Sequence, residues 1–78
     1  MRVTLTQNVR YFEREGNLLY RTDRGLSTGS ELEVGEPIKL FYDHRVQTAV
    51  PFSMDGKTYY MIAKETGLFP ELQDIYER

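Results

Sequence analysis

The 78-residue sequence contains no cysteine and no tryptophan, and it has a single histidine. Without cysteine the chain has no disulfide, no thiolate nucleophile and no Cys-based zinc site, so its stability depends on packing or on a partner. No run approaches the ~18–20 apolar residues that span a bilayer, and the first residues lack the apolar segment of a signal peptide. We therefore expect a single cytoplasmic domain over residues 1–78, too small for two separate domains.

Neither sign of charge dominates, since ten Lys and Arg stand against twelve Asp and Glu, a net charge of −2. The distribution is uneven: residues 1–24 contain five arginines and three acids, whereas residues 25–78 contain five basic and nine acidic residues. A net charge this mild does not indicate a polyanion-binding protein or a DNA mimic. The first third still supplies candidates for an anion-binding or nucleic-acid-binding face, namely Arg10, Arg14, Arg21 and Arg24.

Turn residues and alternating aromatics predict β-structure in the middle of the chain. Asp55-Gly56 predicts a two-residue hairpin, because both central positions of such a turn need positive φ. This turn pairs Phe52 with Tyr59, a cross-strand aromatic pair of the kind that stabilises sheets. The same register pairs Met54 with Lys57, Ser53 with Thr58, Pro51 with Tyr60, Val50 with Met61 and Ala49 with Ile62.

A second turn at Asp43-His44 extends this hairpin into a three-stranded meander over residues 37–63. One face of the meander carries Phe41, Val46, Val50, Phe52, Tyr59 and Met61, and the other carries Ile38, Leu40, Ala49 and Ile62. Two apolar faces predict a sheet that closes on itself or has a cover on its outer side. Pro51 in the central strand indicates a bulge or a local end of the ladder.

The flanking segments complete an all-β prediction. Residues 16–21 and 32–34 are expected as strands, with a loop over 23–30, and residues 6–15 are either a helix or a strand paired with 18–21. We expect a small SH3-like β-barrel of about five antiparallel strands, with its core at about 16–63 and a strand or helix at 3–14. An apolar stripe after Pro70 predicts a short helix over 70–77.

Two stretches of the meander carry a family resemblance. The segment from Leu32 to Leu40, followed by Val50 and by residues 56–62 (Gly-Lys-Thr-Tyr-Tyr-Met-Ile), resembles an uncharacterised domain family of Gram-positive bacteria and their mobile elements. The resemblance covers roughly residues 16–62. It implies an SH3-like barrel and a bacterial or phage origin, and it implies no activity.

No group of residues forms a catalytic, metal or cofactor signature. His44 lies in an expected turn, and Glu31, Glu33 and Glu36 alternate with apolar residues as on a solvated edge strand. Residues 25–30 are rich in glycine and serine but lack the Lys-Ser/Thr of a phosphate-binding loop. We expect no enzyme, no cofactor and no metal.

Clustered aromatics on an open barrel favour a protein-interaction role instead. Tyr42, Arg45, Phe52 and Tyr60 are the candidate partner-binding residues. The first hypothesis is an adaptor domain that binds another protein, in a phage or mobile-element setting. One alternative is weak nucleic-acid binding by the four arginines and exposed tyrosines. A phage inhibitor of a host defence protein is a further alternative, and a homodimer is compatible with the two apolar sheet faces.

Overall fold

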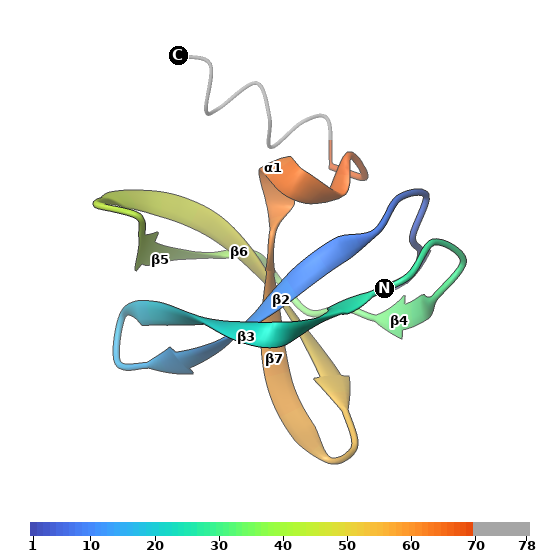
Figure 1. The fold of residues 1–78 in the computed structure, drawn as a ribbon, viewed down its shortest axis with the longest axis horizontal. Coiled ribbons are helices and arrows are strands. Elements are labelled where there is room, and N and C mark those ends of the chain that lie inside the picture. The colour runs from blue at the N-terminus through green and yellow to red at the C-terminus, as the bar shows by residue number, and fades with distance from the viewer. Residues whose placement is uncertain (70–78) are drawn as a thin grey trace.

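The computed structural model describes residues 1–69. It contains seven strands and one short helix: β1 (Arg2–Thr4), β2 (Val9–Glu15), β3 (Leu18–Leu26), β4 (Glu31–Glu33), β5 (Ile38–Tyr42), β6 (Arg45–Met54), β7 (Lys57–Ile62) and α1 (Ala63–Thr66). Five strands form a ring, and β1 pairs with β4 in a separate two-stranded sheet beside it (Figure 1). The predicted all-β fold is confirmed.

The ring runs in the order β2-β3-β5-β6-β7 and closes between β7 and β2. Two of its seams consist of single residue pairs, Phe12 with Tyr60 and Leu18 with Phe41, so it is a ring-like sheet rather than a continuous barrel. The Leu18–Phe41 pair is parallel, which corrects the expectation of antiparallel strands throughout. The reason is geometric: strand direction cannot alternate around a closed ring with an odd number of members.

Both predicted turns of the meander are confirmed in register. Phe52 pairs with Tyr59 across the β6–β7 hairpin, and Phe41 pairs with Val46 across the β5–β6 hairpin. All four central turn residues have positive φ: Asp43 at 56°, His44 at 65°, Asp55 at 54° and Gly56 at 77°. Residues that adopt positive φ in these two turns therefore fix the register of the strands, as the sequence predicts.

Residues 6–15 form a strand rather than a helix, because most of them belong to β2, which pairs with β3. The ring therefore begins at Val9, earlier than the predicted core boundary at residue 16. β3 also continues to Leu26, so the expected loop over 23–30 is wrong in its first half.

A bulge separates β2 from β3 in the middle of their hairpin. Phe12 pairs with Arg21 but Arg10 pairs with Gly25, so three residues of β3 lie opposite Tyr11. The Thr22 hydroxyl holds this bulge, since it donates to the Tyr11 carbonyl oxygen at 2.9 Å and accepts from the Arg24 amide at 3.2 Å. Beyond the bulge the strands close tightly, and a Cβ at position 25 would lie 3.1 Å from the Val9 carbonyl oxygen.

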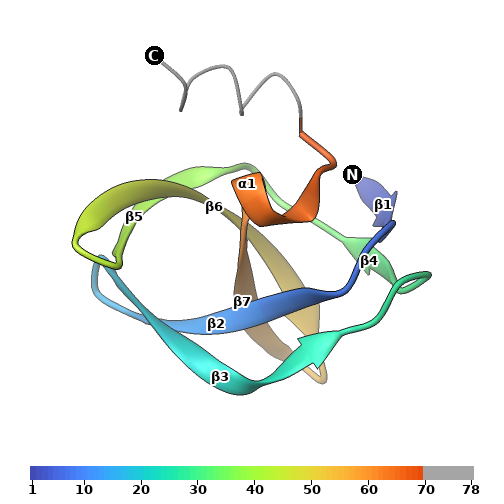
Figure 2. The same cartoon turned by 45° about the horizontal axis from the view of Figure 1, so that its top comes forward.

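Two apolar clusters lie on opposite faces of the ring sheet. The inner cluster takes residues from every ring strand and therefore fills the ring: Phe12, Leu19, Leu40, Ala49, Tyr60 and Ile62. The outer cluster contains Val50, Phe52, Tyr59 and Met61 from the β6–β7 hairpin, and Leu5, Leu32 and Val34 cover it. These last residues belong to the β1 and β4 segments, which lie side by side at one end of the ring (Figure 2). The prediction of a closed and covered sheet is thus confirmed.

Pro51 fits this arrangement without a bulge, because the β6–β7 register is continuous through the Pro51–Tyr60 pair. In a two-residue hairpin the pairs beside the turn exchange hydrogen bonds and every second pair does not, so Pro51 falls at a non-bonded position. On the other side of β6 the ladder to β5 ends at Ala49, as the alternative prediction of a local ladder end requires. The Pro51 carbonyl instead accepts from the Gly35 amide at 2.9 Å.

The chain leaves β7 directly into α1, which the sequence did not predict as a helix. Gly67 ends this helix with a left-handed conformation at φ 69°. The helix predicted over residues 70–77 lies outside the described residues.

Candidate functional site

A row of exposed apolar side chains is the most prominent unpaired feature of the surface. Leu18, Tyr20, Phe41 and Val46 are 41%, 44%, 42% and 58% exposed. Apart from Met1, they are the exposed large hydrophobic residues of the described chain. Isolated exposed apolar residues are ordinary, whereas a contiguous group of them marks an interaction site.

Strand register brings these four residues together, which we call the apolar row. Leu18 pairs with Phe41 across the parallel seam, and Phe41 pairs with Val46 across the next one. Tyr20 follows Leu18 by two residues and therefore lies on the same face of β3. The row crosses β3, β5 and β6 beside the turns at 16–17 and 43–44, which lie on the same side of the molecule in both views (Figures 1 and 2).

Charged side chains border the apolar row on the same face of the sheet. Glu15 and Glu13 pair with Leu18 and Tyr20 from the neighbouring strand β2. Lys39 lies two residues before Phe41, and its ammonium group donates to the Thr48 hydroxyl at 2.8 Å. An apolar centre with a charged rim is the usual composition of a protein–protein contact.

The residues predicted from the sequence as a partner-binding group do not form one surface. Phe52 is 2% exposed in the outer cluster, because β4 reaches over β6 through the Val34–Phe52 bridge. Tyr60 is buried in the inner cluster, and Tyr42 packs half-buried against it. Only Arg45 is exposed, and it faces Tyr42 across the turn. Phe52 and Tyr60 therefore lie in the apolar clusters and not on the surface where the prediction placed them.

Two of the four candidate arginines are held by groups of the chain itself. Arg10 makes two hydrogen bonds to the Glu65 carboxylate, at 2.9 Å from Nε and 2.6 Å from an Nη, and its guanidinium lies over the rings of Phe12 and Tyr42. The bonds to Glu65 raise the pKa of Arg10 above its ordinary value. Arg14 donates to the Gly16 carbonyl oxygen at 2.6 Å and lies 5.8 Å from the Tyr60 ring centroid. The guanidinium groups of both arginines therefore pack on aromatic rings of the inner cluster or of Tyr42 beside it.

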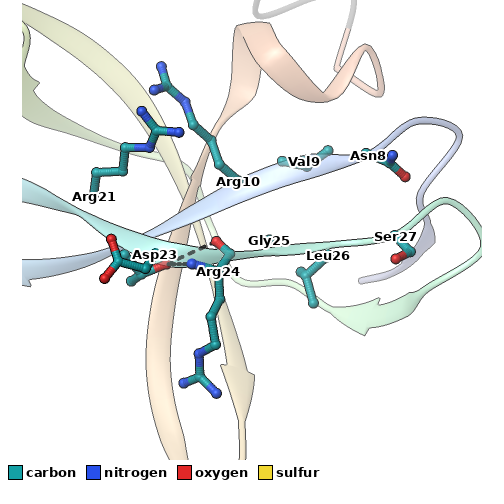
Figure 3. Close-up of a pocket in the computed structure, with 10 residues that line it drawn as sticks. Asn8, Val9, Arg10, Arg21, Asp23, Arg24, Gly25, Leu26 and Ser27 are labelled. Atoms are coloured by element: carbon teal, nitrogen blue, oxygen red, sulfur yellow. Dashed lines mark hydrogen bonds between the residues drawn. The ribbon is translucent and has the colours of Figure 1, made fainter.

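The other two arginines have no carboxylate partner among residues 1–69. Arg24 lies 6.0 Å from the Tyr11 ring centroid, and the Arg21 side chain makes no hydrogen bond or ion pair within residues 1–69. Together with Arg10 they line an open hollow of about 380 Å³ at the β2–β3 bulge, bounded by residues 8–10 and 21–27. Arg10 and Arg21 point to the same side of the hairpin, whereas Arg24 points the opposite way (Figure 3).

The remaining polar candidates behave as surface groups. Glu31 and Glu33 are exposed on β4 and face Arg2 and the N-terminal amine. Within residues 1–69 no three His, Asp or Glu side chains gather as metal ligands would. No helix in the same range is long and apolar enough to span a membrane.

Comparisons with known proteins give no match for this chain. No protein-family model, no curated protein and no solved structure matches it. The resemblance to a family of Gram-positive bacteria therefore stays a prediction.

Phe41 and Val46 lie on one face of the sheet, as the sequence predicts, but the sequence does not indicate that this part of the face is exposed. The sequence does not show how far the β1 and β4 segments extend over this face. They cover Phe52 but do not reach the turn at 43–44. Leu18 and Tyr20 are two residues apart in a strand, so the sequence predicts that they share one face of the sheet. It does not predict whether that face is buried or exposed.

Proposed function

We propose that this protein is a non-enzymatic binding domain that docks another protein chain on the apolar row. The observation that supports it is the register of β3, β5 and β6, which gathers Leu18, Phe41 and Val46 into one exposed apolar group. Aromatic and aliphatic anchors inside a charged rim are the residues that carry most of the binding energy in such contacts.

The experiment compares two glutamate variants on the same strand. Val46→Glu places a charge within the apolar row, at its β6 end, whereas Ser53→Glu places one at an exposed position of β6 on the opposite face. Both sites are solvent-exposed, so both variants should melt close to the temperature of the wild type. Affinity capture from the native host should recover a protein with the wild type and Ser53→Glu, and at least about tenfold less of it with Val46→Glu.

Sedimentation of the purified wild type identifies the case in which the partner is a second copy. A dimer that Val46→Glu converts to a monomer assigns the apolar row to self-association. A wild-type monomer whose captured proteins are the same for both variants overturns the proposal.

A further inference from the structure

We propose that the hollow at the β2–β3 bulge binds a phosphate group between the guanidinium groups of Arg10 and Arg21. This site is separate from the apolar row and does not depend on the proposed function. Three features of the hairpin support this site: the bulge, the charge around the hollow, and the direction in which the arginines point.

The bulge removes the partner that Arg10 would have in a regular hairpin. Continuing the register of the Phe12–Arg21 pair would place Asp23 directly opposite Arg10, as a cross-strand ion pair. The extra residues of β3 place Gly25 opposite Arg10 instead. Arg10 therefore has no side chain opposite it on β3, and both Arg10 and Gly25 line the hollow.

The same register makes Arg10 and Arg21 diagonal neighbours on one face of the hairpin. Arg21 pairs with Phe12, which follows Arg10 by two residues, and both guanidinium groups lie on the same side (Figure 3). Two like charges in this arrangement repel each other unless an anion lies between them. One carboxylate, Glu65, engages Arg10, and none within residues 1–69 engages Arg21.

The two arginines bring complementary properties to an oxyanion. Arg10 is held in place by Glu65 and by two aromatic rings, and its bonds to Glu65 use two of its five N–H donors. Arg21 keeps all of its donors available and is exposed. A fixed guanidinium beside an adaptable one suits a doubly charged phosphate, whose oxygens accept paired N–H bonds from arginine.

The test measures binding of inorganic phosphate by amide chemical shifts of residues 21–25, with chloride at the same ionic strength as the reference. Arg21→Gln should weaken binding about tenfold. Arg2→Gln is the control, because it removes the same charge from an exposed arginine of β1 that does not line the hollow. It should change the dissociation constant less than about twofold.

Asp23→Asn should have the opposite effect and tighten phosphate binding, because Asp23 is the carboxylate that lines the hollow. A parallel titration with a nucleoside 5′-monophosphate distinguishes the source of the phosphate. Affinity equal to that of inorganic phosphate assigns the site to the free ion, and higher affinity assigns it to a phosphate ester. Equal losses in Arg21→Gln and Arg2→Gln, or shifts no larger than those with chloride, overturn the proposal.

Discussion

At the scale of single residues, the two tight turns compare directly. Each places two residues at positive φ, but the second position is His44 in one turn and Gly56 in the other. A side chain at this conformation costs about 1–2 kcal/mol, whereas glycine adopts it freely. The Asp43-His44 turn therefore holds backbone strain that the Asp55-Gly56 turn avoids.

Exchanging residue types at these positions should shift stability in opposite directions. We expect His44→Gly to raise the free energy of unfolding by about 0.5–1 kcal/mol, since relief of strain exceeds the added entropy of the unfolded chain. Gly56→Ala should lower the free energy of unfolding by about 1 kcal/mol. No atom lies within 4 Å of the new Cβ, so the cost comes from the positive φ alone. Urea unfolding followed by circular dichroism measures both, and a stability loss in His44→Gly would contradict the argument.

At the scale of elements, α1 depends on contacts outside itself. It has four residues, and no side chain caps its N-terminus. Glu65 joins it to β2 through Arg10, and the Glu65 carbonyl oxygen also accepts from the Gln7 side chain. Both links hold α1 against the segment that opens the ring.

The Arg10–Glu65 pair should contribute modestly, because about a third of each side chain is exposed. A double-mutant cycle with Arg10→Gln and Glu65→Gln should give a coupling energy of about 0.5–1 kcal/mol, reduced at about 1 M salt. Lys57 and Glu13 form an exposed pair that serves as the comparison, with a smaller coupling. A coupling at Arg10–Glu65 that is zero, or that salt leaves unchanged, would show that α1 is held by packing alone.

The two tight hairpins could be predicted from the sequence, whereas the bulge and the burial of Phe52 could not. Asp55-Gly56 and Asp43-His44 predicted their hairpins in register because turn chemistry and strand alternation are local properties. The bulge was not predictable, since it depends on the Thr22 hydroxyl reaching the Tyr11 carbonyl across the strand. The burial of Phe52 was missed for a similar reason: β4 covers it from a distant part of the chain.

At the scale of the whole molecule, the two apolar clusters share one hairpin. The β6–β7 hairpin sends Val50, Phe52, Tyr59 and Met61 into the outer cluster and Ala49, Tyr60 and Ile62 into the inner one. Neither cluster can lose its packing without releasing side chains of the same two strands. The clusters should therefore unfold together, despite lying on opposite faces of a sheet.

Truncation on each side tests this cooperativity. Leu40→Ala in the inner cluster and Leu32→Ala in the outer one should each cost about 2–5 kcal/mol, a large share of the stability of so small a domain. Each variant should keep one thermal transition at a lower temperature, with tyrosine fluorescence and circular dichroism changing together. Two separate transitions in either variant would show that the clusters are independent.

The parallel seam between β3 and β5 limits how this chain can be shortened. Parallel neighbours cannot be joined by a tight turn, so residues 27–37 must travel the length of the sheet before β5 begins. That return path contains β4, whose Leu32 covers the outer cluster. An odd number of ring strands thus obliges the chain to make a long excursion, and the excursion serves as a lid. The three hairpin turns already have only two residues each, and replacing residues 27–37 with a short linker would both prevent the seam and uncover the core.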